Sequence, residues 1–498
     1  MVFRIAIQLR YYRLVQNKRL SRDASRWLCN RTSFSSCQRH RMKYSLASTI
    51  YALSSGHGKC GVAVIRISGP NAAETIINIA KLKSLPQPRQ ALLRSLKDPV
   101  TNEPLDRGLV LWFPGPKSFT GEDSCELQIH GGPAVVSAVL TALSKLPGYR
   151  PAEAGEFTKR AFHGGKLDLT EVEGLADLIH ADTEAQRKQA LIQMEGNLSH
   201  LYNSWRETLI KSVAHVEAFI DFSEDENIED NVMAIVKNQL ENLKNSIQSH
   251  LADGRCGERL RDGVRTVIVG EPNVGKSSLL NVLCQRPAAI VTPVAGTTRD
   301  VVELHVNIGG YPVIIADTAG LRTETSDEVE KEGILRAHAY AQKADLVILV
   351  IDAAKYVAQM EKMSSVYFDS YVNSYINELQ LHSIATRNNT FESECLTGEK
   401  LLRTEGSAGN IVDEVCGSGK CGNPSRENPC LTQSRYRRHL TDCVACLDEY
   451  FKVSSTGGDT VLAAQQLRKA LRHIGKITGH VSTEQILDVI FKDFCIGK

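Results

Sequence analysis

The sequence contains no apolar run long enough to cross a membrane. No stretch approaches the roughly 18 consecutive apolar residues that a transmembrane helix needs, so we expect no stable membrane insertion. Hydrophobic residues make up 42% and charged residues 23% of the 498-residue chain, an ordinary balance for a globular protein. A chain of this length has room for about three domains.

The first 42 residues almost lack acidic side chains. They contain ten Lys and Arg but a single acid, Asp23, and the rest of the chain has 49 basic and 56 acidic residues. Apolar side chains recur at Phe3, Ile7 and Tyr11 with arginines between them, and the Ser-rich stretch RTSFSSCQRH follows. This composition is typical of a mitochondrial transit peptide, which we predict at residues 1–42, with the mature protein in the matrix. A disordered arm that binds nucleic acid is the alternative.

The chain also lacks a secretory signal, so we expect its thirteen cysteines to be reduced thiols. Cys443 and Cys446 form a lone C-x-x-C motif, and the second pair that a zinc ribbon needs is badly spaced. We therefore interpret them as neighbours one turn apart on a helix. Cys495 is fourth from the end, but Gly497 and Lys498 fit the C-a-a-X lipid-attachment pattern poorly. A frayed terminus with an incidental cysteine is the plainer alternative.

Hydrophobic patterning divides the remaining chain. Residues 43–164 contain short apolar runs separated by Gly and Pro, which predicts an α+β domain with a sheet. Residues 165–257 and 432–498 have helical spacing and no proline. Between them, residues 258–431 alternate strands with helices, except for a divergent segment at 355–399. We predict a multidomain α+β and α/β protein in which the α/β domain is inserted into a discontinuous helical domain.

The strongest local pattern is a phosphate-binding loop. Gly270 to Ser277 match G-x-x-x-x-G-K-S/T, with the strand-like VRTVIV before them and a helix-compatible run after them. Backbone N–H groups of such a loop face phosphates, Lys276 would reach the β and γ oxygens, and Ser277 would ligate Mg²⁺. The nucleotide-binding residues predicted here are Asn273, Val274, Gly275, Lys276, Ser277 and Ser278.

Two downstream segments favour a GTPase over a generic ATPase. AGTTRD offers Thr297 and Thr298 for a switch loop that closes over Mg²⁺. DTAG follows an apolar strand and would hold Mg²⁺ through water and sense the γ-phosphate. Its residues, also predicted to bind nucleotide, are Asp317, Thr318, Ala319 and Gly320. Leu321 stands where Ras-like enzymes orient the attacking water with Gln, so another group must do this.

The sequence has no Asn-Lys-x-Asp motif to read the guanine ring. In TRNNTF, Asn388 is followed by Asn389, and Phe391 occupies the position of the aspartate. We therefore expect phosphate and Mg²⁺ binding to be intact and guanine selectivity to be weakened.

Seven stretches, in order along the chain, resemble the MnmE/TrmE family of tRNA uridine-modification GTPases in its mitochondrial form. They are GVAVIRISG, FPGPKSFTGEDSCELQIHGG, GEFTKRAFHGGKLDL, GEPNVGKSSLLN, AIVTPVAGTTRD, DTAGLR and FCIGK. The likeness covers residues 47–353 and 432–498. It implies an N-terminal domain similar to folate-binding domains and a Ras-like P-loop G domain inserted into the helical domain.

The resemblance also implies how hydrolysis is catalysed. A K⁺ ion would replace the arginine finger, and the matching ligand positions are Asn273, Thr292, Val294 and Thr297. The catalytic acid of the family aligns with Glu330, allowing one extra residue in this chain. From the residues alone, Glu330 is one of several acids in ETSDEVEKEG, and a solvated helix face is the alternative.

A one-carbon site is implied in the N-terminal domain. The family holds 5-formyl-tetrahydrofolate or methylene-tetrahydrofolate, and the matching positions are Arg66, Glu126, Lys166 and Lys498. A carboxylate and cationic groups suit the amide edge and glutamate tail of a pterin cofactor, although each residue alone could be an ordinary surface charge. Cys495 would act nearby as a nucleophile or proton donor; a packing role is the alternative.

The implied function is modification of C5 of the wobble uridine of mitochondrial tRNAs, with an aminomethyl or taurinomethyl group. An FAD-dependent partner of the MnmG/GidA family would take part, and GTP hydrolysis would drive association of the G domains of a homodimer. The alternatives are a GTP-gated RNA-binding or ribosome-assembly factor of the Era type, and a homologue impaired in nucleotide binding.

Overall fold

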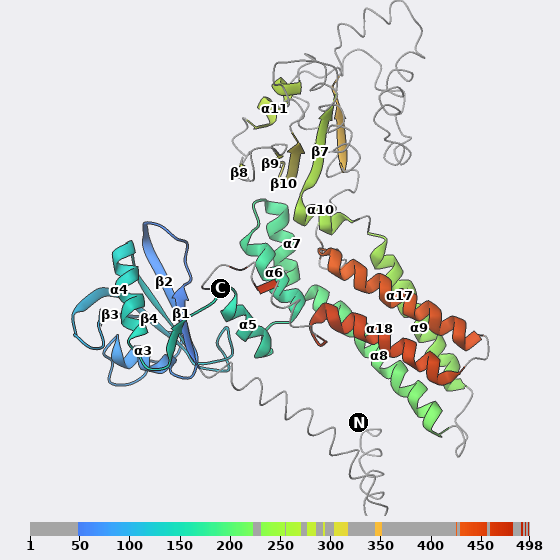
Figure 1. Cartoon of the computed structure of the whole chain (residues 1–498), viewed down its shortest axis with the longest axis horizontal. Helices are drawn as coiled ribbons and strands as arrows, with labels where there is room; N and C mark the ends of the chain where they lie inside the picture. Colours follow the sequence, from blue (N-terminus) through green and yellow to red (C-terminus); the bar gives the residue numbers. More distant parts are fainter. Residues whose placement is uncertain are drawn as a thin grey trace, which may run out of the picture. The chain divides into compact units, whose positions relative to one another are not determined.

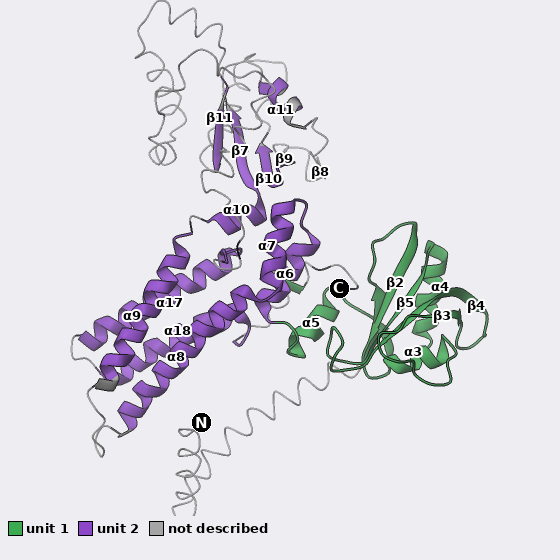
Figure 2. Ribbon diagram, turned by 180° about the vertical axis from the view of Figure 1, so that it is seen from behind, with its two compact units in different colours: residues 1–167, 489–498 green, residues 168–488 purple. Residues whose placement is uncertain are grey.

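The computed structural model describes most of the chain in two compact units (Figure 2). The first contains residues 1–167 and 489–498, and the second residues 168–488. The described residues are 48–222, 231–253, 255–269, 276–284, 292–293, 303–316, 344–350, 425, 429–455, 459–481, 490–491, 494 and 497. The predicted transit peptide and the divergent segment at 355–399 lie outside them. None of the helices described has both the length and the apolarity to cross a bilayer.

The first unit is built on a six-stranded sheet in the order β3-β4-β5-β2-β1-β6 (Figure 1). Neighbouring strands are antiparallel except β1 and β6, which are parallel. The strands are β1 (Thr49–Leu53), β2 (Cys60–Ser68), β3 (Leu92–Lys97), β4 (Pro104–Phe113), β5 (Ser124–Gly131) and β6 (Tyr149–Pro151). The helices are α3 (Ala72–Asn78), α4 (Pro133–Ser144) and α5 (Glu156–His163).

The two faces of this sheet differ in chemistry because side chains alternate along each strand. On one face, Ile65 and Ile67 of β2 and Leu127 of β5 are buried in a core with α3 and α4. On the other face, the same strands present Arg66 and Glu126. At the margin of that face, Ile50 and Ala52 of β1 pack with Ala152, which follows β6, and with Phe157 of α5. A half-polar, partly covered face is therefore available for a binding site.

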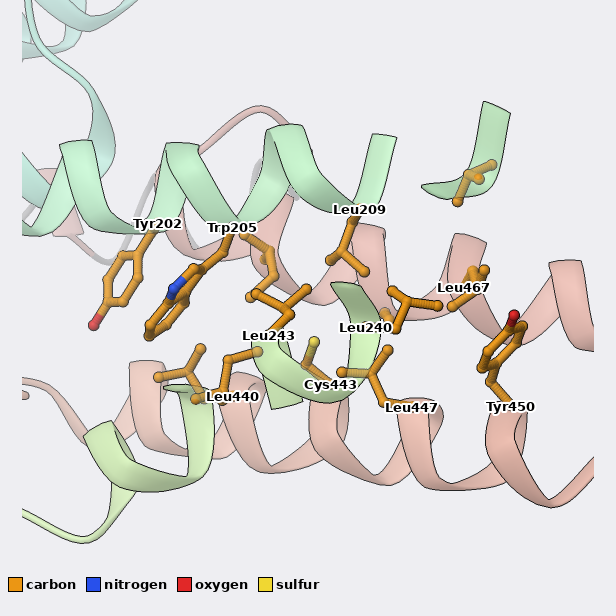
Figure 3. Close-up of a cluster of buried hydrophobic side chains, with 14 of the residues drawn as sticks. Tyr202, Trp205, Leu209, Leu240, Leu243, Leu440, Cys443, Leu447, Tyr450 and Leu467 are labelled. Atoms are coloured by element: carbon orange, nitrogen blue, oxygen red, sulfur yellow. The ribbon is translucent and has the colours of Figure 1, made fainter. Parts of the chain in front are cut away.

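In the second unit, two stretches distant in sequence share one helical core. α8 (Asn197–Phe222) and α9 (Asn231–Leu251) pack with α17 (Ser434–Ser455) and α18 (Thr460–Thr478). Figure 3 shows their side chains interleaved, including Trp205, Leu240, Leu447 and Leu467. The predicted discontinuous helical domain is thus present. Cys443 and Cys446 both lie on α17, one turn apart, and Cys443 is part of this core.

A five-stranded sheet in the order β11-β7-β10-β9-β8 interrupts the helical sequence. Its strands are β7 (Val264–Val269), β8 (Thr292–Pro293), β9 (Glu303–Ile308), β10 (Tyr311–Ala316) and β11 (Leu346–Leu349). The helices in contact with it are α7 (Glu184–Met194), α10 (Cys256–Asp262) and α11 (Lys276–Cys284), and α6 (Leu169–Ile179) packs on α7. β7 is parallel to β10 and β11, whereas β9 and β10 form a hairpin through Gly309 and Gly310. The mixed α/β character predicted from the sequence is confirmed.

Acid is expected to destabilise the helical core through His250. Its Nε2 is 3.2 Å from the Tyr202 hydroxyl, and burial lowers its pKa to about 4. In the unfolded chain the pKa is about 6.5, so below that pH only the unfolded state takes up the proton. Stability is therefore lost as the pH falls from about 6.5 towards 4, by about 2 kcal/mol at pH 5.

The measurement is the urea midpoint of tryptophan fluorescence at pH 7.5 and pH 5. His250→Gln should reduce the acid-induced shift, and His215→Gln, at an exposed position on α8, should leave it unchanged. An equal shift in the wild type and in His250→Gln would contradict this assignment.

Candidate functional site

Arg66 and Glu126 form a charged pair on the half-polar face of the first sheet. They are register partners on β2 and β5, and Arg66 Nε lies 3.0 Å from Glu126 Oε1. Both side chains are about four-fifths buried, at 22% and 20% exposure. The guanidinium carbon lies 5.1 Å from the ring centre of Phe119 and 5.8 Å from that of Phe157. Aromatic rings hold the guanidinium in place, so the pair is preorganised to meet a planar polar ligand.

A second arginine beside this pair is more deeply buried. Arg160 of α5 is 4% exposed and donates hydrogen bonds to Glu122 at 2.9 Å and to Glu156 at 3.0 Å. Ser68, on the same face of β2 as Arg66, donates to Glu122 at 3.0 Å. Burial raises the pKa of Glu156, but hydrogen bonds from Arg150 and the charge of Arg160 outweigh it, and the net shift is downward. These carboxylates balance the buried cation and fix the loop around Glu122.

This network was not predicted from the sequence. Glu122, Glu156 and Arg160 lie within the stretches SFTGED and GEFTKRAF that carry the family resemblance. That resemblance was the available signal, but it did not indicate which charges are buried together.

Lys166 contacts the same loop. A Cβ atom placed on Gly121 would lie 3.5 Å from Lys166 Cε, so the lysine stem runs beside this glycine. Phe119, two residues earlier, stacks near Arg66. Arg66 and Lys166 thus both lie against the loop that contains Phe119 and Gly121, and Glu126 is paired with Arg66.

The C-terminal tail is anchored to the same unit. Ser54 Oγ donates a 2.7 Å hydrogen bond to the carbonyl of Gly497, just beyond the end of β1. Gly497 has φ +100° and leaves no room for a side chain, because an added Cβ would lie 2.0 Å from the carbonyl oxygen of Leu53. Upstream, Phe491 and Phe494 are each 3% exposed.

Strand register relates this anchor to the charged pair. Leu53 is one residue from Ala52, which is the register partner of Arg66. Cys495 and Lys498 lie outside the described residues, but Lys498 follows Gly497 by one Cα step of about 3.8 Å. The sequence pattern predicted that residues 432–498 belong to the helical domain. Residues 489–498 instead group with the first unit.

The family resemblance implies that this face binds a reduced folate, and on that premise loss of Arg66 should weaken the binding. Arg66→Ala would leave Glu126 without its cation and remove the stacked guanidinium, so affinity for 5-formyl-tetrahydrofolate should fall at least tenfold, by about 1.4 kcal/mol or more. Arg66→Lys should rescue little, because an ammonium lacks the planar fork.

The measurement is calorimetric titration with 5-formyl-tetrahydrofolate. Arg94→Ala, at an exposed position on β3, is the matched control and should bind as the wild type does. If Arg66→Ala binds 5-formyl-tetrahydrofolate with wild-type affinity, the Arg66–Glu126 pair is not part of the folate site.

The second sheet has the arrangement that a phosphate-binding loop requires. β7 ends at Val269, and α11 begins at Lys276, whose side chain is half-buried. β10 runs parallel to β7 and ends at Ala316, directly before DTAG. Because the carboxyl ends of parallel strands lie at one edge of a sheet, both segments begin at the same edge.

Most predicted nucleotide and metal residues are not described. Of the phosphate loop, only Lys276, Ser277 and Ser278 fall in α11, and Ser278 is exposed there. Thr292 is in β8. The predicted residues outside the description are Asn273, Val274, Gly275, Val294, Thr297, Thr298, Asp317, Thr318, Ala319, Gly320 and Glu330.

Comparisons with known proteins match both parts of the chain. A family model described as the MnmE helical domain matches residues 169–495, and one described as the GTP-binding protein TrmE N-terminus matches residues 49–166. A Danio rerio protein named as a subunit of mitochondrial 5-taurinomethyluridine-tRNA synthase is 50% identical over 479 residues, covering 90% of this chain and 93% of the relative.

Two further relatives extend the match from animals to bacteria. A human protein with the same name is 47% identical over 473 residues, covering 91% of this chain and 93% of the relative. A Parvibaculum lavamentivorans protein named tRNA modification GTPase MnmE is 48% identical over 450 residues, covering 90% of this chain and 100% of the relative.

Proposed function

The chain belongs to the MnmE family of tRNA-modification GTPases, and we propose that it is a mitochondrial GTPase that modifies C5 of the wobble uridine of tRNA. The observation that carries this is the end-to-end match: relatives at 47–50% identity cover about nine-tenths of the chain. The Danio rerio and human relatives are named for 5-taurinomethyluridine, so the group that we propose for this chain is of the taurinomethyl type. The match spans the N-terminal and helical domains as well, so a ribosome-assembly factor of the Era type is not favoured.

We further propose that the second sheet carries a Ras-like G domain. Support comes from the strand–loop–helix arrangement at Val269 to Lys276 and from the parallel strand that leads into DTAG. Lys276 would bind the phosphates, Ser277 and Thr298 would hold Mg²⁺, and Glu330 would position the attacking water. Bound Mg²⁺ would supply charge neutralisation on the phosphates.

We propose that the first unit is similar to a folate-binding domain and binds the one-carbon donor. Arg66 and Glu126 offer an ordered cation and acceptor, and Lys166 lies on the adjoining loop. These groups fit the acidic tail and amide edge of a reduced folate. Bound folate would supply the one-carbon unit, while the chain would orient it and bring Lys498 and Cys495 next to it.

We propose further that the protein acts in the matrix as a homodimer, together with an FAD-dependent MnmG/GidA-family protein. The test is reconstitution of the full chain with such a partner, GTP, 5-formyl- or methylene-tetrahydrofolate and unmodified mitochondrial tRNA. Modified wobble uridine should form only when the chain, the partner and GTP are all present. Product formed without the chain would refute its role.

The preference of this chain for GTP over ATP is expected to be weaker than that of GTPases with an Asn-Lys-x-Asp motif. Without Asn-Lys-x-Asp, the base loses hydrogen bonds whose combined contribution can reach several kcal/mol. Competition of GTP and ATP for the full chain should therefore show a smaller preference than a complete motif would give. A strong preference for GTP would mean that residues 355–399 rebuild the base pocket in another way, and no binding of either would favour the impaired homologue.

A further inference from the structure

Three potential metal ligands meet on the helical bundle of the second unit. His439 and Asp442 lie three residues apart on α17, and His473 lies on α18. One ligand atom from each lies within 4.8 Å of the other two. The rings of His439 and His473 are 5.7 Å apart between centres, and His473 Nδ1 is 3.5 Å from Asp442 Oδ2. The three side chains therefore converge from two helices on one point.

Within the described part of the chain, neither histidine of this cluster has a hydrogen bond at Nδ1, and His473 Nδ1 has only the 3.5 Å ion-pair contact with Asp442. Both nitrogens are buried. His439 is only 9% exposed. A buried nitrogen without a hydrogen bond is unfavourable, and a metal ion bound there would compensate for it.

Burial disfavours the charged form of both imidazoles. Burial lowers the pKa of His439 to about 4, helped by the charges of Arg435, His473 and Lys476. Burial also lowers the pKa of His473. Neutral imidazole is the form that binds metals, and Asp442 adds one negative charge.

The neighbouring cations lower the affinity for a metal ion, but they do not block the point where the three side chains converge. Arg435 is already paired with Glu173, at 2.9 Å, and donates to the carbonyls of Lys476 and Ile477. The remaining neighbouring charges, Lys476 and Arg438, lower the pKa of His473 through space. The charge of Asp442 raises the pKa of His473 and so opposes these two cations.

We propose that His439, Asp442 and His473 form a Zn²⁺ site that clamps α17 to α18. Two imidazoles and a carboxylate are a ligand set that zinc uses, with bonds of about 2.0–2.2 Å and a fourth position open to water. Such bonds bring ligand atoms to about 3.4 Å from one another, so the cluster must contract by roughly 1 Å. The half-exposed side chain of Asp442 and the partly exposed ring of His473 have the freedom to do so.

The expected result is one zinc equivalent that depends on this cluster. The full chain, stripped with chelator, is titrated with Zn²⁺ by calorimetry and melted with and without the metal. The wild type should gain thermal stability, because a ligand that binds only the folded state stabilises it. His473→Gln and Asp442→Asn should lose that gain and bind at least roughly tenfold more weakly at this site.

Two controls separate this site from other metal binding. His215→Gln, at an exposed position on α8, should behave as the wild type, and Asp442→His should retain the site with three imidazoles. The chain has thirteen cysteines, but thiol-bound zinc would be the same in the wild type and in His473→Gln. Equal stoichiometry and equal stabilisation in these two proteins would overturn the proposal.

Discussion

Gly497→Ala is expected to reduce wobble-uridine modification at least tenfold while GTP hydrolysis by the full chain is unchanged. The new Cβ would lie 2.0 Å from the carbonyl oxygen of Leu53, and the backbone at φ +100° is already strained for any residue other than glycine. Non-glycine residues in such conformations cost about 1–3 kcal/mol, and here the clash with backbone adds to that. The tail should leave its anchor at Ser54, and Lys498 should leave with it.

Deletion of Lys498 tests whether the lysine that the anchor holds in place is itself needed. It preserves Gly497 and its hydrogen bond to Ser54 but removes the terminal ammonium, so we expect the same loss of modification and weaker folate binding. Gly61→Ala is the matched control, because a Cβ at Gly61 meets no atom within 4 Å. Full modification in Gly497→Ala would show that the anchor is dispensable.

Cys495→Ser separates thiol chemistry from the role of the tail as an anchor. Serine keeps the size of the side chain but is a far weaker nucleophile at neutral pH. If Cys495 reacts with the one-carbon unit or the uridine, modification should be lost while folate affinity remains. Wild-type modification in this variant would leave the tail with an anchoring role alone.

Hydrolysis of GTP is expected to be at least tenfold faster in K⁺ than in Na⁺ at equal ionic strength. Leu321 occupies the position where Ras-like enzymes use Gln, and an arginine finger contributes roughly 10³–10⁵ in rate, so its replacement must supply a comparable charge. The segment TPVAGTTRD resembles the potassium loop of the family, and Asn273 lies in the phosphate loop.

Asn273→Ala should remove the difference between the two salts, because its side-chain oxygen would be a K⁺ ligand. Steady-state phosphate release measures both rates. Holding the ionic strength constant removes general screening from the comparison. Equal wild-type rates in K⁺ and Na⁺ would contradict the potassium role.

The parts of the fold that the sequence predicted are those encoded by local patterns. The phosphate-loop motif predicted a strand and a helix around residues 270–275, and β7 and α11 flank them. Helical spacing without proline predicted the two stretches that form the bundle core. Local patterns suffice here because each element's period is set by its own residues.

Side-chain clusters assembled from distant elements could not be predicted. Arg160 and Glu122 are 38 residues apart, and only the packing of α5 onto the sheet brings them together. His439 and Asp442 are visible as an i, i+3 pair, but the rotation of α18 that presents His473 to them depends on the bundle core. The place of Gly497 beside β1 depends on the close approach of the Leu53 carbonyl, which no local pattern in the sequence encodes.

The central claim, modification of the wobble uridine, is tested most directly in cells. Mass spectrometry of nucleosides from mitochondrial tRNA is compared between cells with and without the protein. We expect the 5-taurinomethyl-type uridine, or its aminomethyl counterpart, to disappear without the protein and to return with the wild-type chain but not with Lys276→Ala. Unchanged wobble-uridine modification in cells without the protein would contradict the account.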